Sequence, residues 1–548
     1  MASVRSPVYA DSPPPALPLR ARALLVASVV VVGLLNVLKP VHVDDALYLA
    51  IARQIVAHPL DPYGFEINWQ HTLQPAYAVS ISPPLLSYYH ALWLSLGFHE
   101  GFALHVMMIP WLALLAWSVT ALLARTGGHA FLATAVLIVS PGVFGGTNLM
   151  LDVPMTACLT AAVECHFRSL DRKSARWALL AGLAAGAAVL IKYPAIIFLG
   201  ICLGSVVVRR DWRAIVPAMC CAATFFGWQA WSRALYGAGQ LQQATSFLER
   251  FHGEGGRKTI ERVLQQFALL GATFPIWIVS LRHGRAKLVG LLTALMALFI
   301  GQYLLVHSDA WYSERWKLYG FQVALFLGAF SFGEVLCSAL GFKENSTIRF
   351  AAIIWILGTI AVTTLSAPFV AVRYLLPALP ALLMLQALTL RASKGTLALT
   401  LGVTAAIGLG VAITDLRRAA FYPRTVAAIR VEHPNSKIFF CGHWGFQWYC
   451  EAAGMAAWDA RWLDAPSGSL IVVAMRADPI PIHPFLKARM SLTPIREYVL
   501  PPAPFGLSVW RPTRPNEVGL CFYGWEFPHL PWGLSAENAE TILVFEVK

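Results

Sequence analysis

The chain has 548 residues, of which 57% are hydrophobic and 13% charged, and its formal net charge is +13. Soluble domains carry about 25% charged residues, so this composition excludes an ordinary soluble protein. Apolar runs long enough to cross about 30 Å of hydrocarbon recur along the first three quarters of the chain. The composition therefore predicts a mainly α-helical, polytopic membrane protein.

Hydropathy predicts about thirteen membrane spans. No small-residue cleavage pattern follows the first one, so we interpret it as a retained anchor and not as a signal peptide. The apolar segment Pro83–Phe98 is short, and we expect it to lie on the membrane surface. The thirteen ranges are 22–39, 101–124, 130–147, 153–168, 176–191, 194–208, 214–234, 261–281, 287–306, 317–338, 349–367, 373–390 and 396–414.

Basic residues set the orientation in a plasma (inner) membrane. Short loops rich in Lys and Arg stay cytoplasmic, so the N-terminus is expected inside. If Pro83–Phe98 also crossed, every later basic loop would face outward. The net charge thus reflects inner loops and does not indicate a nucleic-acid partner. The loop residues are Arg125, Arg168, Arg172, Lys173, Arg176, Arg209, Arg210, Arg213, Arg282, Arg285, Lys287, Lys343, Arg349, Arg391 and Lys394.

Three parts follow from this topology: a cytoplasmic tail (1–21), a transmembrane domain (22–415) with a first outer loop at about 40–100, and an outer domain (416–548). The last part is richer in Pro, Trp and charge. Its residue patterns predict a small α/β extracytoplasmic domain. The predicted helices are Thr425–Glu432 and Phe446–Ala453, and the predicted strands are Lys437–Phe440, Leu470–Ala474, Leu507–Trp510 and Thr541–Val547.

Cysteines and histidines leave two questions about the outer face open. A Cys441–Cys450 disulfide suits an oxidising compartment, but spacing alone does not show that the geometry allows it. His42, His71 and His90 lie in the first outer loop without a spacing diagnostic of a metal site. No metal-binding residue is therefore predicted, and a divalent ion is not excluded.

Ionisable residues from distant parts of the sequence are expected to meet on the outer face. Asp44 and Asp45 directly follow the first span, Asp152 begins the fourth, Lys192 lies between the fifth and sixth, and Arg373 begins the twelfth. An ionised side chain near hydrocarbon loses hydration, so charge at such positions usually has a function.

Each residue also has a structural explanation. Asp44 or Asp45 can cap the following helix, as can Asp152, because Asp is a favoured N-cap residue. Lys192 and Arg373 can anchor their helices at the lipid headgroups. For any one of them this explanation stays open, but four independent features need not share one face.

These motifs resemble a known group of membrane enzymes. The resemblance extends over nearly the whole chain and depends on the order and topology of individually weak motifs. The matching residues are Asp44-Asp45-Ala46-Leu47-Tyr48, Ser82-Pro83-Pro84-Leu85, Leu151-Asp152-Val153-Pro154, Lys192 and the Arg-Tyr-x-x-Pro-x-x-Pro motif from Arg373 to Pro380. The chain is similar to the polyprenyl-phosphate-sugar-dependent glycosyltransferases of the GT-C class. This superfamily includes the protein O-mannosyltransferases and the lipid A aminoarabinose transferase.

The sequence departs from that group at two positions. The aminoarabinose transferase has Glu-Lys-Pro where this chain has Ser82-Pro83-Pro84, so the lysine that helps to hold the lipid phosphate has no counterpart here. Asp45 replaces the more common Glu after the first Asp. The first departure leaves the phosphate-binding residues, and the lipid A assignment with them, open.

The resemblance implies a GT-C fold and transfer of a hexose or pentose from a polyprenyl-phosphate donor on the outer face. It implies inversion in a single step, while a double displacement, which needs a second carboxylate close behind the anomeric carbon, stays open. The acceptor would be a lipid A or lipopolysaccharide-type glycolipid, a polysaccharide or a protein. Membrane lipids, donor and acceptor are the expected partners, and no cofactor is predicted. The sequence does not indicate the sugar, the acceptor or the oligomeric state.

The resemblance also assigns roles to residues. A carboxylate can take the proton of an acceptor hydroxyl, and cations stabilise the charge that grows on a departing phosphate. Asp44 is the expected base, with Asp152 orienting hydroxyl groups and Asp45 in support. The residues expected to bind the substrate and its lipid phosphate are Lys192, Arg373, Tyr374 and Tyr48.

A transporter and a non-catalytic envelope-binding protein are the two alternatives to an enzyme. A transporter would place ionisable residues in the middle of spans and show paired broken helices from an internal repeat, and the sequence shows neither. A non-catalytic envelope-binding protein would not require Asp44, Asp152 and Arg373 to converge. The sequence therefore favours the enzyme.

Overall fold

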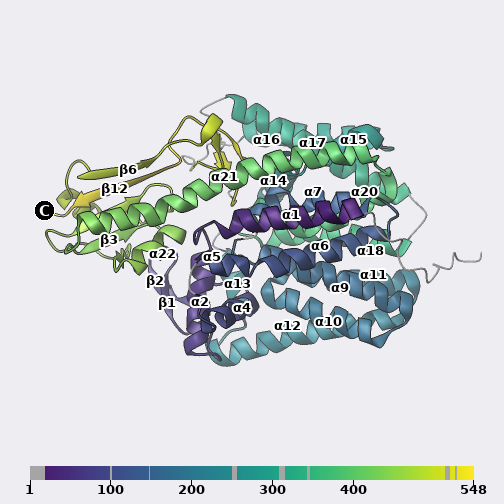
Figure 1. Ribbon diagram of the computed structural model, residues 1–548, viewed down its shortest axis with the longest axis horizontal. Coiled ribbons are helices and arrows are strands. Elements are labelled where there is room, and N and C mark those ends of the chain that lie inside the picture. The colour runs from purple at the N-terminus through teal and green to yellow at the C-terminus, as the bar shows by residue number, and fades with distance from the viewer. Residues whose placement is uncertain are drawn as a thin grey trace, which may run out of the picture.

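The computed structural model describes residues 19–98, 101–146, 148–249, 256–307, 315–341, 346–511, 519–524 and 527–548. Residues 1–18 of the predicted tail, and Lys343 among the basic loop residues, lie outside these ranges. Helices run side by side through most of the molecule, and a β-sheet lies at one end of it (Figure 1).

The long helices follow the predicted apolar runs. Among the described residues, seven helices are long and apolar enough to cross a membrane, or eight if one bent pair counts as a single span. The chain is therefore a multi-pass membrane protein, and the count of thirteen spans stays a prediction. The seven contain α6 (Ile109–Ala124), α12 (Ile215–Tyr236), α16 (Lys287–Val306), α17 (Arg315–Gly341), α18 (Ser346–Ser366), α20 (Leu379–Leu390) and α21 (Lys394–Glu432). Other helices of the bundle are α1 (Leu19–Val37), α9 (Asp152–Arg172), α10 (Ala175–Ile191) and α11 (Ile197–Arg209).

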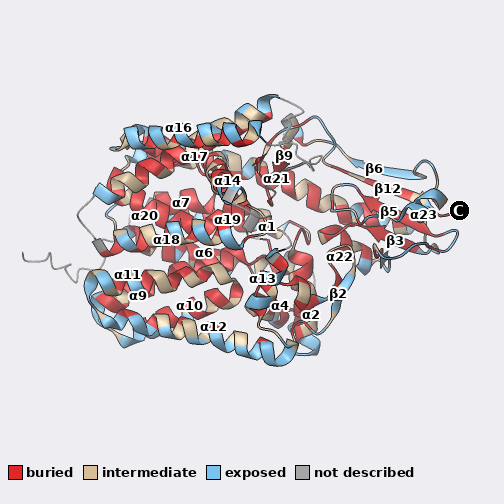
Figure 2. Ribbon diagram, turned by 180° about the vertical axis from the view of Figure 1, so that it is seen from behind, coloured by how far each residue is buried: buried red, intermediate tan, exposed pale blue. Residues whose placement is uncertain are grey.

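Many residues on the outermost helices, α12 and α16, are exposed (Figure 2), and large apolar side chains are among them. Examples are Met219 and Phe226 on α12 and Leu292 and Phe299 on α16. In water such a surface would drive association, whereas in a bilayer it faces lipid tails. The exposed faces therefore agree with a membrane environment.

Two predicted spans are broken by proline. The run 261–281 forms α14 (Gly256–Thr273) and α15 (Trp277–His283), which are bent by 83° at a break that contains Pro275. The run 130–147 forms α7 (Ala130–Ile138) and α8 (Pro141–Gly146). Proline lacks the backbone N–H that helix continuation requires, so each helix ends before it.

The predicted boundary at residues 415/416 is not a helix end. Helix α21 (Lys394–Glu432) has 39 residues and is about 58 Å long, so the predicted helix Thr425–Glu432 is only its last part. Its second half buries Tyr422, Val426 and Ile429 in the core under the sheet. Hydropathy falls at Asp415, but the helical period continues, so one helix connects the two parts of the molecule.

A five-stranded mixed sheet forms the C-terminal part, with the order β4-β3-β5-β12-β6. Strand β3 pairs in parallel with β4 and β5, and β12 pairs antiparallel with β5 and β6. The strands are β3 (Ile438–Cys441), β4 (Ala456–Ala457), β5 (Leu470–Ala474), β6 (Arg496–Leu500) and β12 (Glu540–Glu546). Helices α22 (Trp444–Ala452) and α23 (Pro484–Arg489) accompany them.

Strands β3 and β5 are fully buried, which explains their continuous apolar sequence. The predicted run Leu507–Trp510 forms two short strands, β7 (Leu507–Ser508) and β8 (Trp510–Arg511). β7 pairs with β11 (Gly533–Leu534), and β8 pairs with β9 (Gly519–Cys521), which in turn pairs with β10 (His529–Leu530). Cys441 and Cys450 are both buried and free, so the structure has no disulfide between them.

The first outer loop is structured and lies between the helices and the sheet (Figure 1). It contains α2 (Asp45–Ala57), the hairpin β1 (Glu66–Asn68) and β2 (Leu73–Pro75), α3 (Ala76–Val79) and α4 (Leu85–Ser95). α4 packs on α2. Its 11 residues extend about 16 Å, too short to cross a membrane. α5 (Gly101–Val106) follows α4, and α13 (Gln240–Glu249) follows α12.

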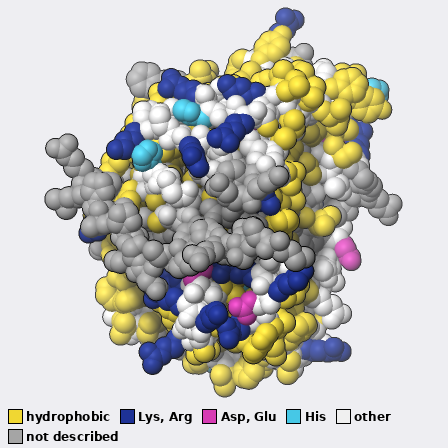
Figure 3. Space-filling model, turned by 90° about the vertical axis from the view of Figure 1, so that its right-hand side faces the viewer, with side chains coloured by type: hydrophobic (Ala, Val, Ile, Leu, Met, Phe, Trp, Pro, Cys, Tyr) yellow, Lys and Arg dark blue, Asp and Glu magenta, His cyan; other side chains and the backbone are white. Residues whose placement is uncertain are grey.

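Basic loops gather at the end of the bundle opposite the sheet, where Lys and Arg side chains are prominent (Figure 3). Ion pairs connect separate loops there, since Asp171 binds both Arg125 and Arg209 at 2.6 and 2.9 Å. A contact of 3.0 Å between His283 Nε2 and the Thr396 hydroxyl connects two further loops. The basic loops therefore share one end, as the alternating topology requires.

Candidate active site

Arg373 is the centre of a charged cluster at the sheet-facing end of the bundle. It lies in the short helix α19 (Val372–Leu375), and its guanidinium is almost completely buried. Its Nη2 donates to Asp44 Oδ2 at 3.0 Å, and its Nε lies 3.6 Å from Asp152 Oδ2. The structure thus joins three of the predicted site residues, which are up to 329 positions apart in sequence.

Lys192 completes this cluster from a break between two helices. α10 ends at Ile191, and Lys192 has an extended backbone before the 3-10 turn η1 (Tyr193–Ile196). Its Nζ donates to Asp152 Oδ1 at 2.6 Å. Both oxygens of Asp152 therefore face a cation, and the predicted convergence of these four residues is present.

Aromatic rings line the same cluster. Lys192 Nζ lies 4.3 Å from the ring centroid of Tyr374, and the Arg373 guanidinium carbon lies 5.3 Å from it. Burial raises the pKa of Tyr48, as does the nearby Asp44, so its phenol stays protonated and can donate a hydrogen bond. Tyr48 and Tyr374 thus lie beside the charged groups, as expected.

The helix-capping explanation does not account for the two carboxylates. Asp44 occupies the N-cap position of α2 and Asp152 is the first residue of α9, yet neither N-terminus has a side-chain capping hydrogen bond among the described residues. Instead, both carboxylates turn to cations. The backbone before Asp44 is also unusual, because Val43 has φ +48°, a value that costs a β-branched residue about 1–3 kcal/mol.

Asp45 has a different environment from the other acids. Its side chain is completely buried, and its Oδ2 accepts a hydrogen bond from the His42 backbone N–H at 3.0 Å. Burial raises its pKa to about 8, so the group is mostly protonated at pH 7. The resemblance implies catalytic support from Asp45, and the geometry adds a structural part in the turn that positions Asp44.

A second buried network lies next to the cluster, and the sequence did not predict it. Lys39 Nζ donates to Asp415 Oδ2 at 2.7 Å and to Asn148 Oδ1 at 2.8 Å. Asp415 also accepts from the Tyr523 hydroxyl at 2.6 Å and lies 3.0 Å from His42 Nε2. The network therefore joins α1, α21 and the C-terminal part behind the residues that lead to Asp44.

Tyr523 connects the two networks, since the Arg373 guanidinium carbon lies 6.0 Å from its ring centroid. A signal for this network was present in the sequence, because Asp415 follows an apolar run of the last predicted span and such acids are usually paired. Its partners are more than 100 positions away, so only the structure identifies them.

A family model with the description dolichyl-phosphate-mannose-protein mannosyltransferase matches residues 82–227. The chain is similar to that family over this segment. The match confirms the resemblance to the GT-C glycosyltransferases and supports glycosyltransferase activity. Asp152 and Lys192 lie within the matched segment, whereas Asp44 and Arg373 lie outside it.

Two solved structures are also similar to the chain. The crystal structure of ArnT from Cupriavidus metallidurans bound to undecaprenyl phosphate is 15% identical, covers 84% of this chain and 94% of ArnT, and has a TM-score of 0.41. The cryo-EM structure of the arabinofuranosyltransferase AftD from Mycobacteria is 13% identical, covers 97% of this chain and 40% of AftD, and has a TM-score of 0.42. No curated protein matches the chain significantly.

Proposed function

We propose that the chain is an integral-membrane glycosyltransferase that moves a hexose or pentose from a polyprenyl-phosphate donor to an envelope acceptor. The acceptor is a glycolipid, a polysaccharide or a protein. The observation that carries this proposal is the buried Arg373 between Asp44 and Asp152, with Lys192 on the second carboxylate. Two cations and two acids at the end of a membrane bundle suit both a phosphate leaving group and an acceptor hydroxyl.

In the proposed reaction, the acceptor oxygen attacks the anomeric carbon of the donor sugar. The new C–O bond forms as the bond between this carbon and the phosphate oxygen breaks, and polyprenyl phosphate leaves with the electron pair. Lys192 and Arg373 stabilise the negative charge that grows on this phosphate. The proton of the acceptor hydroxyl goes to Asp44.

The two carboxylates differ in a way that favours Asp44 as the base. The Asp44 side chain is 23% exposed and contacts one cation, Arg373. Asp152 is only 4% exposed, and each of its two oxygens faces a cation, Lys192 or Arg373. We assign proton transfer to Asp44 and orientation of the cations to Asp152. Because Asp152 is held by two cations, it is a poor second nucleophile, which favours inversion in one step.

Orientation in the membrane is part of the proposal. With the basic loops in the cytoplasm, the cluster and the C-terminal part face outward in the plasma membrane, and α4 lies on the membrane surface. A reporter enzyme that works only outside the cytoplasm should then be active when it is fused after Lys548. Activity of a cytoplasmic reporter at that position would reject this orientation.

The proposed activity is tested with the purified full chain in lipid nanodiscs. Polyprenyl-phosphate sugars are offered with envelope extracts as acceptors, and mass spectrometry follows both released polyprenyl phosphate and the glycosylated product. We expect turnover with at least one hexose or pentose donor and its loss in Arg373→Ala. Arg496→Ala is the matched control. This exposed arginine lies on strand β6 and pairs with Glu432, not with a residue of the charged cluster. Equal turnover in the Arg373→Ala variant would reject the assignment of the site.

A further inference from the structure

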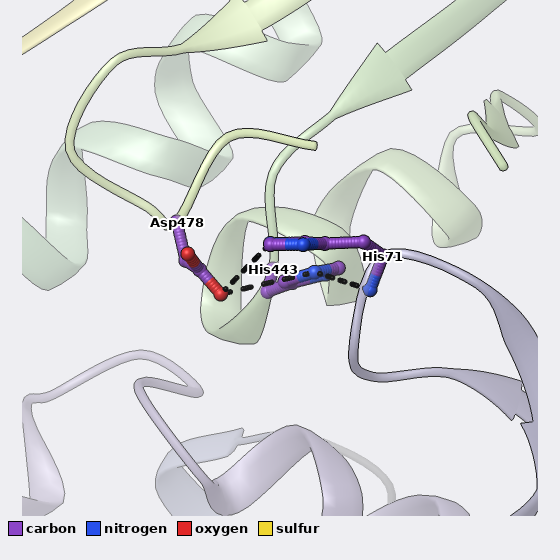
Figure 4. A group of neighbouring side chains, drawn as sticks. All are labelled: His71, His443 and Asp478. Carbon is purple, nitrogen blue, oxygen red and sulfur yellow. Dashed lines mark hydrogen bonds and ion pairs between the residues drawn. The ribbon is translucent and has the colours of Figure 1, made fainter. Parts of the chain in front are cut away.

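Two histidines and an aspartate meet where the first outer loop contacts the C-terminal part (Figure 4). His71 Nε2 lies 3.3 Å from Asp478 Oδ2, and His443 Nε2 lies 4.0 Å from the same oxygen. The imidazole rings are stacked, with centroids 5.2 Å apart and planes 16° from parallel. Figure 4 shows the Asp478 carboxylate at one edge of both rings.

Backbone hydrogen bonds hold the three loops in place. The His71 carbonyl accepts from the Ala460 N–H at 2.8 Å, and the His443 N–H donates to the carbonyl of Ala477, beside Asp478, at 2.7 Å. The hairpin β1–β2 is also fixed to the C-terminal part, because the Asn68 amide donates to the Trp458 carbonyl at 2.7 Å. The side chains therefore project from a fixed frame rather than from independent loops.

The backbone at this cluster is strained. Seven non-glycine residues among those described have positive φ, and three are here: His71 at +68°, Asp478 at +49° and Trp444, next to His443, at +65°. Each such residue costs about 1–3 kcal/mol unless its surroundings enforce the conformation. Strain at all three loops indicates that the positions of these side chains matter.

We propose that His71, His443 and Asp478 bind a divalent transition-metal ion of the Zn²⁺ type. Two imidazoles and one carboxylate are a usual ligand set for such ions, with a water molecule in the fourth position. His71 and Asp478 are 35% and 48% exposed, which leaves a path for the ion and the water, whereas His443 is 1% exposed and anchors the site.

The three ligand atoms lie within 4.8 Å of one another, and the two pairs that include Asp478 fit this ion with a small adjustment. Tetrahedral zinc with bonds of about 2.1 Å separates its ligand atoms by about 3.4 Å. The pair of His71 and Asp478, 3.3 Å apart, already meets that value, and the pair of His443 and Asp478, 4.0 Å apart, must close by about 0.6 Å. The half-exposed Asp478 carboxylate has room to move. Binding also replaces a long hydrogen bond of 3.3 Å from the His71 N–H to His443 Nε2.

Further contacts suit His443 as a ligand. Its Nε2 is the acceptor of the hydrogen bond from the His71 N–H, so this nitrogen has a lone pair directed at the cluster.

The ion would connect the C-terminal part to the segment that leads to Asp44. A Cβ atom on Gly445, two residues after His443, would lie 2.6 Å from the Val41 carbonyl oxygen. The Val41 N–H in turn donates to the Tyr449 hydroxyl on α22 at 2.9 Å. Metal binding at His443 therefore holds α22 against residues 41 and 42, and the proposal does not depend on the nature of the reaction at Asp44.

The test uses the full chain, purified with a tag that contains no histidine and freed of metal with a chelator. Titration with Zn²⁺ alone is followed by calorimetry, and thermal unfolding is measured with and without the ion. We expect one ion per chain with a Kd of about 1 µM or lower, and a higher Tm in its presence. His71→Ala and Asp478→Asn should each weaken binding at least about 10-fold and remove the increase in Tm.

His58→Ala is the matched control, because His58 is an exposed histidine of the same outer loop. The two test variants alter half-exposed side chains and should fold, whereas His443→Ala removes a buried one, so it is not used. Equal Zn²⁺ affinity in the His71→Ala, Asp478→Asn and unmodified chains would overturn the proposal, as would a Kd above about 1 mM for the unmodified chain. Glycosyl transfer is not a readout in this experiment, so its result is independent of the proposed activity.

Discussion

Two charged clusters lie at opposite ends of the helical bundle, and they are built in opposite ways. At the basic end, Glu164 is 2% exposed and binds Arg125 through two hydrogen bonds of 2.7 and 3.0 Å, and Arg168 through one of 2.6 Å. Its arginines are 20–25% exposed. At the other end the cation Arg373 is buried, at 8%, and the acid Asp44 is the more exposed partner, at 23%.

This difference separates a structural cluster from a functional one. Both oxygens of Glu164 are occupied by arginines whose outer sides face solvent, so the cluster can only hold helices together. Arg373 has its charge in a buried site, where solvent screens an arriving phosphate less than in water. The open side of Asp44 leaves lone pairs for an acceptor hydroxyl. The following predictions test whether the two ends differ in this way.

The largest loss of turnover is expected when Asp44 is replaced. Asp44→Asn keeps the size of the side chain and a good N-cap residue but cannot take a proton, so turnover should fall by about 10³-fold. Purified variants are compared at equal concentration, with the Tm measured to exclude unfolding. Full turnover would mean that Asp44 is not the base or that the acceptor is already ionised.

The second largest loss of turnover is expected for the two cations of the cluster. Lys192→Ala or Arg373→Ala should lower turnover about 10²–10³-fold, because each removes a charge that stabilises the leaving phosphate. Arg373→Lys should recover only part of the loss, since lysine cannot contact Asp44 and Asp152 with separate nitrogens of one planar group. Rates are measured from released polyprenyl phosphate. Unchanged rates in both alanine variants would assign these residues to membrane anchoring.

A smaller effect of another kind is expected at the basic end. Glu164→Gln leaves Arg125 and Arg168 without their shared anion, so it should destabilise the protein by roughly 1–3 kcal/mol. Turnover of the remaining folded protein should stay within about twofold of the unmodified chain, because this cluster does not contact the site. Tm and rate are both recorded. A specific loss of rate at unchanged Tm would contradict the comparison of the two ends.

The sequence predicted the parts of the fold that depend on local composition. Apolar runs located the helices, and the charge of the short loops predicted that Asp44, Asp152, Lys192 and Arg373 would meet. It did not predict that α21 continues beyond Asp415, because hydropathy changes there while helical packing against the sheet does not. Proline breaks within spans were also missed, although Pro275 was visible.

Contacts between distant polar residues were the part that sequence could not supply. Asp415 pairs with Lys39 across 376 positions, and His71 lies against His443 across 372. No local spacing reports such a pair, since each partner looks like an isolated polar residue. The complete burial of Asp45 was not predicted for a related reason, because it depends on packing between α2 and other elements.

The smallest effect concerns Asp45 and pH. Its pKa is about 8 in the folded chain and about 3.9 when unfolded, so folding favours the protonated form. This stabilisation is complete below pH 4 and is lost as the pH rises to 8. The Tm of the unmodified chain should therefore fall between pH 4 and 8 more steeply than that of Asp45→Asn, which does not ionise. Parallel Tm curves for the two proteins would contradict the protonated assignment.

A double-mutant cycle between Asp44 and Arg373 tests the central claim, that the outer cluster acts as one catalytic unit. Turnover is measured for Asp44→Asn, Arg373→Ala and the double variant, with Arg496→Ala as the control. Groups that act together are not additive, so the double variant should be no more than a few-fold slower than the slower single variant. If the two losses instead multiply, or if all variants turn over like the control, Asp44 and Arg373 do not form one active site.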